Sequence, residues 1–269
     1  MLSVVVPIYN EEANLPELLR RTSAALEATG EAWEIVLVDD GSRDGSARII
    51  RQAHDADPRV KLIALSRNFG HQPAITAGVH HARGDAVILL DGDLQDPPEL
   101  IPRLVEKWRD EGFQVVLAQR RSRAEHGAAR RIGFRLFYPL MRHVSDLPAG
   151  TTAAEAGIFG LMDRVVVDCF NRLPERNRFI PGLRQWLGFR QGAVEYDRRD
   201  RAAGEPKQTL GRLIKYAMDG MVSFSVRPLR VATWTGFGCA AIGFLTAIVF
   251  IVRRLFFHDP AVTGFTTLL

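Results

Sequence analysis

The sequence lacks several signatures that would assign it to a familiar enzyme class. No G-x-x-x-x-G-K-[ST] segment is present, which argues against a P-loop nucleotide hydrolase. No G-x-G-x-x-G segment follows the first apolar run, which argues against a dinucleotide dehydrogenase. The seven histidines lack the H-E-x-x-H spacing of metalloproteases, and the G-x-S-x-G motif of α/β-hydrolases does not occur. The chemistry of this chain must therefore depend on other groups.

Cysteine is also scarce. Cys169 and Cys239 are the only two and lie far apart, which predicts a reducing compartment and no disulfide framework. The first residues have no basic lead-in, and their apolar run is too short for a signal peptide. With 269 residues, 46% hydrophobic and 25% charged, the chain is expected to form one large globular domain plus an appendage. The net charge of +4 is mild and suits an anionic membrane surface or phosphate-bearing substrates as well as nucleic acid.

One run of 22 residues, 231–252, contains no charge and is bounded by arginines on both sides. As a helix it would be roughly 33 Å long at about 1.5 Å per residue, enough to cross a bilayer core. The alternative is a buried helix of a soluble protein, but Gly, Thr and Trp between basic flanks favour a transmembrane helix. Arginines at both ends leave the orientation undecided. The chain is expected to stop before a second span.

The first hundred residues alternate strand and helix signals. Apolar runs predict strands at 2–6, 33–38, 60–65 and 86–90, and stretches with helical periodicity follow them. This alternation predicts an α/β fold with a mostly parallel, doubly wound sheet flanked by helices. Ligands of such sheets collect outside the carboxyl ends of the strands, where the polar residues of this sequence also fall.

Beyond residue 118 the pattern becomes basic and amphipathic. The stretches 127–144 and 209–225 interleave basic and apolar residues, and we expect interfacial helices that attract anionic lipid head groups. Ordinary packed helices with solvated arginines are the alternative. We therefore predict a catalytic domain at 1–225 that includes these helices, and a membrane region at 226–269.

Carboxylates cluster after the fourth predicted strand. ILLDGDLQDPP places Asp91, Asp93 and Asp96 within six positions, a density of negative charge that destabilises a fold unless a cation lies among them. Carboxylates two apart on such a turn can both reach one hard cation, and Mg²⁺ and Mn²⁺ prefer oxygen ligands. Asp-Gly-Asp is also good turn chemistry, but the second acidic pair, Asp39 and Asp40, favours a metal site.

The chain resembles a known family through several motifs in the same order and spacing. These are VVVPIYNEE, VDDGSRDGS, SRNFGHQPAITAG, GDAVILLDGDLQDPPELI, LMDR and SFSVRPLR. Together they resemble the polyprenyl-phosphate glycosyltransferases, bacterial relatives of dolichol-phosphate mannose synthase with a GT-A domain, over nearly the whole chain. The resemblance implies inverting transfer of one sugar from a nucleotide-sugar, UDP-sugar favoured over GDP-sugar, to undecaprenyl phosphate. It also implies Mg²⁺ or Mn²⁺ as cofactor.

The same resemblance implies where the protein works and with what. The catalytic domain is expected on the cytoplasmic side of the inner membrane, where nucleotide-sugars are made. Its expected partners are the donor, the polyprenyl phosphate, membrane lipid and further copies of the chain, and no nucleic acid.

Site residues are carried over by position. Asp91 and Asp93 match the metal ligands, with Asp93 favoured as the direct ligand, and together with Glu155 they are the expected catalytic residues. Arg130 and Arg131 match a basic pair for the lipid phosphate. The residues matching nucleotide-sugar contacts are Pro7, Tyr9, Glu11, Val38, Asp39, Asp40, Asp91, Asp93, Gln95, Arg120, Arg201 and Lys207.

One departure from the family pattern leaves alternatives open. Relatives commonly read aspartate-x-glycine-aspartate-phenylalanine-arginine before LMDR, whereas this chain places Ile158 and Gly160 where the second aspartate and the arginine would stand. A non-catalytic, membrane-bound nucleotide-sugar-binding protein is therefore one alternative. A processive polysaccharide synthase is another, although GLRQWLG does not supply the Q-x-x-R-W motif of such enzymes.

Overall fold

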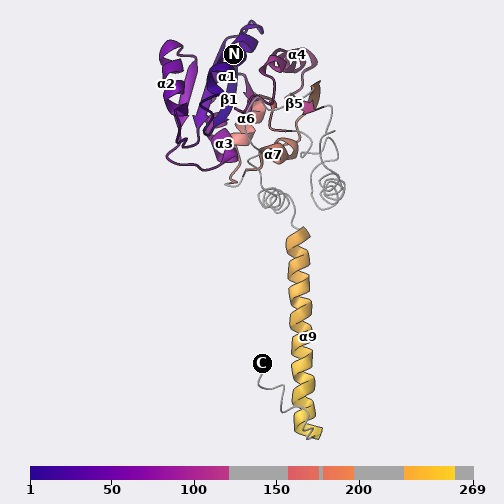
Figure 1. Cartoon of the computed structure of the whole chain (residues 1–269). Coiled ribbons are helices and arrows are strands. Elements are labelled where there is room, and N and C mark those ends of the chain that lie inside the picture. The colour runs from indigo at the N-terminus through magenta and orange to yellow at the C-terminus, as the bar shows by residue number, and fades with distance from the viewer. Residues whose placement is uncertain (121–156, 176–177, 197–226, 258–269) are drawn as a thin grey trace. The chain divides into compact units, whose positions relative to one another are not determined.

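The computed structural model describes residues 1–120, 157–175, 178–196 and 227–257 (Figure 1). The chain forms two compact units, Met1–Phe224 and Ser225–Leu269. The strands of the first unit are β1 (Leu2–Ile8), β2 (Trp33–Asp39), β3 (Val60–Ala64), β4 (Ala86–Leu89), β5 (Val115–Arg120), β6 (Gly160–Asp163) and β7 (Gln191–Tyr196). Its helices are α1 (Leu15–Glu27), α2 (Ser46–Ala56), α3 (His71–His81), η1 (Pro98–Leu100), α4 (Ile101–Glu111), α6 (Arg164–Arg172) and α7 (Ile180–Trp186).

The seven strands form one sheet in the order β3-β2-β1-β4-β6-β5-β7. All neighbours pair in parallel except β6, which is antiparallel to both β4 and β5. This arrangement confirms the prediction of a mostly parallel α/β sheet. The carboxyl ends of β1, β2, β3 and β4 consequently meet at one edge of the sheet.

Helices cover both faces of the sheet (Figure 1). The central strands are buried throughout and mostly apolar, as strands covered on both faces are expected to be. One core cluster joins alternate residues of these strands to α1, α2 and α4, for example Val4 to Leu18 and Leu104. The other cluster joins the intervening residues to α3, α6 and α7, for example Val5 to Ile75. The result is a three-layer α/β/α domain.

The expected strands are present with small shifts at their ends, whereas several later elements were not predicted. The first strand extends to Ile8, and the third and fourth end one residue earlier than expected. Strands β5, β6 and β7 and helices α6 and α7 carry too short a pattern to be read from the sequence. The predicted amphipathic stretches at 127–144 and 209–225 lie outside the described residues.

The second unit contains α9 (Arg227–Phe257). Within it Ala232–Arg253, 22 residues with a mean hydropathy of 2.2, is long and apolar enough to cross a membrane, and no other helix among the described residues is. None of this stretch is buried, and Trp234 is 74% exposed. The helix is therefore not part of a core formed by the described residues, which favours a membrane span over a buried helix.

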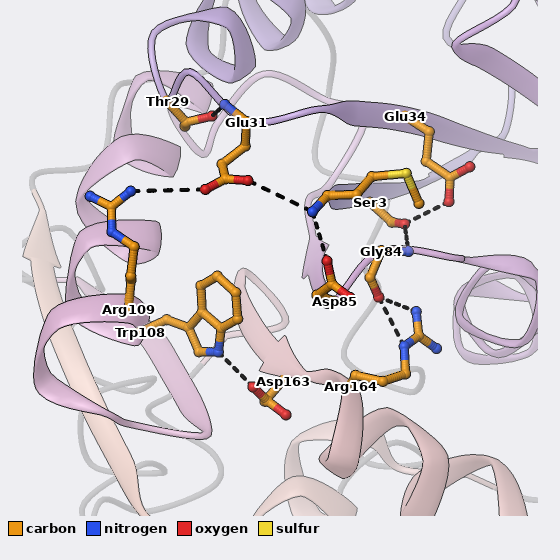
Figure 2. Close-up of polar contacts among 11 residues, drawn as sticks. Ser3, Thr29, Glu31, Glu34, Gly84, Asp85, Trp108, Arg109, Asp163 and Arg164 are labelled. Carbon is orange, nitrogen blue, oxygen red and sulfur yellow. Dashed lines mark hydrogen bonds and ion pairs between the residues drawn. The ribbon is translucent and has the colours of Figure 1, made fainter.

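A polar network closes the amino edge of the sheet, opposite the edge where the ligand is expected. Figure 2 shows Ser3 between Glu34 and Gly84: the Ser3 hydroxyl donates to Glu34 at 2.6 Å and accepts from the Gly84 N–H at 2.7 Å. Lys61 and the N–H of Arg83 also donate to Glu34. Burial raises the pKa of this carboxyl, but the hydrogen bonds outweigh burial and hold the pKa below its usual value.

Neutralising Glu34 tests how much this network stabilises the fold. Because its pKa is lowered in the folded state, Glu34 stabilises the protein above the usual carboxyl range, and that stabilisation is lost as the pH falls through the lowered pKa. Glu34→Gln is expected to reduce the free energy of unfolding by about 2 kcal/mol at neutral pH, and this effect should disappear as the pH falls through the lowered pKa of Glu34. Urea unfolding of the first unit, measured at several pH values, gives this free energy. Glu27→Gln, at a carboxylate that is 62% exposed, is the control and should change little.

Candidate active site

A cleft of about 510 Å³ opens at the carboxyl ends of β1, β2 and β3. Tyr9 lines it from β1, and Asp39 and Ser42 line it from β2. Three arginines also line it, namely Arg43, Arg51 and Arg67. A cleft with one acidic wall and several cations can accept both the hydrogen-bond donors and the negative charge of a nucleotide. The cleft thus lies where the sequence predicts the nucleotide pocket.

The two acidic residues after β2 have different surroundings. Asp39 lines the cleft, and its Oδ1 accepts the N–H of Ser42 at 3.1 Å. Asp40 is 3% exposed, and its two carboxylate oxygens accept the N–H groups of Phe69 at 2.7 Å and Gly70 at 2.9 Å. Asp39 is therefore placed to contact a ligand in the cleft, whereas Asp40 holds the loop between β3 and α3.

Gly41 shapes the floor of the cleft. Its φ of +69° lies in the left-handed region, and a Cβ at this position would lie 2.6 Å from the carbonyl carbon of Arg67. Only glycine can combine this backbone conformation with so close an approach of another backbone segment. The turn after β2 and the loop after β3 therefore pack directly on each other beside the cleft.

The D-x-D segment follows β4 at the same edge of the sheet. Asp91 and Asp93 are the first acids beyond the strand, and Asp93 Oδ1 accepts the N–H of Gln95 at 3.1 Å. Gln95 is 5% exposed. The third acid, Asp96, is 2% exposed and accepts a hydrogen bond from the Tyr196 hydroxyl, so it ties this loop to β7. Asp96 is thus buried and held by the fold, whereas Asp91 and Asp93, the acids predicted as metal ligands, are only partly buried.

His71, the first residue of α3, contacts the D-x-D segment. Its Nε2 lies 2.9 Å from Asp91 Oδ1. Burial lowers the pKa of His71, but the hydrogen bond to Asp91 and the negative charges of Asp91, Asp93 and Asp40 outweigh it and raise the pKa above its ordinary value. Three carboxylates, those of Asp91, Asp93 and Asp40, therefore act together on the His71 side chain. Sequence reasoning missed His71, although its position directly after the third strand and a glycine-containing loop places it at the ligand edge.

The donor set suits a hard divalent cation that is shared with a substrate. Among the described residues, no cluster of three or more His, Cys, Asp and Glu side chains could hold a metal ion by itself. Mg²⁺ and Mn²⁺ sites that serve phosphate chemistry commonly use one or two carboxylates, with waters and phosphate oxygens completing the shell. Asp91 and Asp93, two carboxylates that follow β4 at the ligand edge of the sheet, fit such a site.

The remaining predicted residues of the first two strands lie around this edge. Pro7 is buried in β1, and Glu11 accepts a hydrogen bond from Asn14 at 2.7 Å at the start of α1. The Val38 side chain is fully buried in the core that faces α3, so its backbone is the part that can face a ligand. Arg120 ends β5, and its side chain lies outside what the structure describes, as do Arg130, Arg131, Glu155, Arg201 and Lys207.

The segment that departs from the family pattern is held by a buried arginine from α7. Arg184 is 1% exposed, and its guanidinium donates to the carbonyls of Gly157 at 2.6 Å and Ile158 at 2.9 Å. A Cβ at Gly160 would lie 2.7 Å from the Val116 carbonyl oxygen and 3.2 Å from Arg184 Nη1. The Val116 carbonyl therefore blocks a side chain at position 160, and Arg184 occupies part of the remaining space. Because Gly160 pairs with Leu89, the segment lies beside the end of β4.

Family comparison agrees with this geometry. The sequence profile described as Glycosyl transferase family 2 matches residues 3–170. The chain belongs to this family. The match begins in β1 and ends in α6, so it includes the cleft, the D-x-D segment and His71. The chain is therefore a glycosyltransferase.

Three relatives match almost the whole chain. An uncharacterized glycosyltransferase, YkcC of Bacillus subtilis, is 43% identical over 99% of this chain and 81% of its own length. The bactoprenol glucosyl transferase of Shigella phage SfV is 41% identical over 100% and 86%. The undecaprenyl-phosphate 4-deoxy-4-formamido-L-arabinose transferase of Salmonella paratyphi A is 39% identical over 94% and 76%. These relatives confirm the resemblance to the polyprenyl-phosphate glycosyltransferases.

Solved structures confirm the GT-A fold. The glucosyl-3-phosphoglycerate synthase of Mycobacterium tuberculosis, in complex with Mn²⁺, UDP and phosphoglyceric acid, matches with a TM-score of 0.54 at 20% identity, over 83% of this chain and 78% of that one. S. aureus TarS matches with a TM-score of 0.50 at 18% identity, over 73% of this chain. The chain spans 59% of that TarS structure.

Replacing Gly41 tests whether the cleft binds a nucleotide. Gly41→Ala is expected to weaken UDP or GDP binding more than tenfold, because the new Cβ would displace the backbone at Arg67, which also lines the cleft. Calorimetric titration of purified protein measures this.

Gly30→Ala is a matched control for this experiment. Gly30 also has a φ of +69°, but nothing lies within 4 Å of a Cβ built there. Both variants should lose about 1 kcal/mol of stability through the left-handed backbone, and Gly41→Ala should lose more through its contact with the Arg67 backbone. If the two variants bind nucleotide equally well, this cleft is not the nucleotide site.

Proposed function

We propose that this protein is an inverting, metal-dependent glycosyltransferase that moves one sugar from a nucleotide-sugar to a polyprenyl phosphate. UDP-sugars are the favoured donors and GDP-sugars the second choice; undecaprenyl phosphate is the acceptor. The single observation that carries the proposal is that the nucleotide-sized cleft and the D-x-D segment lie at one edge of the sheet. The names of the bactoprenol and undecaprenyl-phosphate transferase relatives support the acceptor class.

The residues of the site divide into those that bind the nucleotide, those that hold the metal and those that stabilise charge at the reacting groups. Asp39 and Ser42 contact the nucleoside in the cleft, and the cleft arginines attract the donor's negative charge. Asp91 and Asp93 would hold Mg²⁺ or Mn²⁺. The bound ion supplies electrostatic stabilisation of the nucleoside diphosphate as the glycosidic bond breaks. Arg120, Arg201 and Lys207 are proposed to take up further charge on the leaving group, and Glu155 to place a carboxylate near the reacting carbon.

The acceptor needs little chemical activation. A phosphate monoester has a second pKa of about 6, so it is largely ionised at neutral pH and already nucleophilic. Positioning two anions in line is the harder task, and we propose that Arg130 and Arg131 bind the lipid phosphate for this purpose. An apolar segment within α9 would keep the domain at the bilayer that holds the acceptor. The proposed location is the cytoplasmic face of the inner membrane, in a homo-oligomer.

A donor panel tests this function. Purified full-length chain is incubated with radiolabelled UDP- and GDP-sugars and undecaprenyl phosphate, with Mn²⁺ or with chelator. We expect one labelled lipid product with one donor, and its loss in chelator. Donor binding without a labelled lipid across the panel would favour a non-catalytic binding protein. A polymer formed in the absence of lipid would favour a processive synthase.

A further inference from the structure

Three consecutive residues at the start of α3 connect two acidic groups of the site. The N–H groups of Phe69 and Gly70 donate to the two carboxylate oxygens of Asp40, at 2.7 and 2.9 Å. His71 Nε2 lies 2.9 Å from Asp91 Oδ1. We call Phe69, Gly70 and His71 the carboxylate clip. It contacts the acid beside the nucleotide cleft with its backbone and the first acid of the D-x-D segment with its side chain.

The clip joins strands that are not neighbours. Asp40 follows β2 and Asp91 follows β4, and β1 lies between these strands in the sheet. The clip follows β3 in the chain and contacts residues after β2 and after β4, so it crosses the carboxyl end of β1. Gly70 has a φ of +101°, which only glycine adopts without strain, so the turn that aims His71 is built into the sequence. The geometry links the nucleotide side of the edge to the metal side.

His71 is held firmly enough to orient its partner. It is the first residue of α3, and the next turn of this helix contains Ala74 and Ile75, which are fully buried against the sheet. The pair itself is partly exposed, at 45% for the His71 side chain and 30% for that of Asp91. Exposed pairs contribute little to folding stability. A purely structural role would thus explain little of this contact.

We propose that His71 is a positioning residue that fixes the orientation of the Asp91 carboxylate and so sets the affinity for the metal and the nucleoside diphosphate together. The inference rests on the proposed function, because it takes Asp91 as a metal ligand. Hydrogen-bond partners behind a metal ligand commonly change metal affinity by about 10- to 100-fold when they are removed. The clip extends this effect to the nucleotide, since its anchor on Asp40 lies beside the cleft.

Binding measurements on three variants test the inference. His71→Leu removes the hydrogen bond, whereas His71→Gln places an amide N–H where Nε2 stands. His80→Leu, at an exposed histidine of the same helix, is the matched control. Calorimetry measures the affinity for UDP and GDP with Mn²⁺ and with chelator. We expect His71→Leu to weaken Mn²⁺-dependent nucleotide binding by about 10- to 100-fold. His71→Gln should stay within about threefold, and His80→Leu should match the unmodified protein.

A double-mutant cycle with Asp91→Asn separates positioning from a general effect on the fold. If His71 acts through Asp91, His71→Leu has no further effect on Mn²⁺-dependent binding once Asp91 is replaced. Full additivity of the two changes, or unchanged Mn²⁺ dependence in His71→Leu, would overturn the inference while leaving the proposed function intact. Failure of the unmodified protein to bind either nucleotide with Mn²⁺ would instead overturn the proposed function.

Discussion

Replacing Asp93 with alanine is expected to abolish sugar transfer. Without this carboxylate the D-x-D segment would keep one of its two proposed metal ligands, and the charge that develops on the leaving diphosphate would lose its main stabilisation. We expect a loss on the order of a thousandfold in kcat, or about 4 kcal/mol in the activation barrier. Transfer of labelled sugar to undecaprenyl phosphate at saturating donor measures it.

The third acid of the same loop supplies the control for this change. Asp96→Asn keeps an acceptor for the Tyr196 hydroxyl, so the loop stays tied to β7 and activity should remain near that of the unmodified protein. Thermal unfolding of both variants separates a folding defect from a catalytic one. Retention of more than about a tenth of the activity by a folded Asp93→Ala protein would contradict the proposed metal site.

Introducing arginine at position 160 is expected to destabilise the fold rather than to restore a family feature. The new side chain would begin 2.7 Å from the Val116 carbonyl oxygen and 3.2 Å from the Arg184 guanidinium, so it brings both a steric clash and a second buried positive charge. Overpacking of this kind costs about 3 kcal/mol. Urea unfolding of Gly160→Arg measures the loss.

A double variant shows whether Arg184 is the cause. Arg184→Leu removes the competing guanidinium but leaves the carbonyls of Gly157 and Ile158 without that donor. The pair Gly160→Arg/Arg184→Leu should therefore be more stable than the sum of the single changes predicts, by at least about 1 kcal/mol. Gly157→Ala, with nothing within 4 Å of its new Cβ, is the control. Strict additivity would mean that Arg184 and position 160 do not compete.

The departure at Ile158 and Gly160 thus has a physical explanation at one of its two positions. Gly160 fits because the Val116 carbonyl and Arg184, which comes from an element distant in sequence, fill the adjacent space. Restoring the family residues at positions 158 and 160 alone would leave that arginine in place. The structure gives no comparable account of Ile158.

The first four strands could be predicted because each is an apolar run that ends in polar residues, and such runs need no tertiary information. Strand β6 could not, since four residues carry no periodicity and its place between β4 and β5 depends on pairing with residues more than forty positions away. Strands β5 and β7 are likewise defined by their partners.

Part of the candidate site could likewise be predicted from the sequence, and part could not. Asp91 and Asp93 follow a readable strand, so their location at the ligand edge follows from the α/β pattern. The different surroundings of Asp39 and Asp40 depend on the loop that carries Phe69 and Gly70, and adjacent aspartates look alike in a sequence. The contact between His71 and Asp91 was missed for the same reason, because it spans 20 positions and forms only when α3 packs on the sheet.

The reversed direction of β6 has a consequence for how such enzymes diversify. Strand β5 finishes, and β6 starts, at the same rim of the sheet, so the 39 residues between them, 121–159, leave and rejoin the sheet at one edge. That excursion carries the arginines proposed to grip the lipid phosphate. If those arginines bind the acceptor as proposed, a chimera that exchanges residues 121–154, and so keeps Glu155 and the segment held by Arg184, would change what is glycosylated while the strands that carry the donor cleft stay the same.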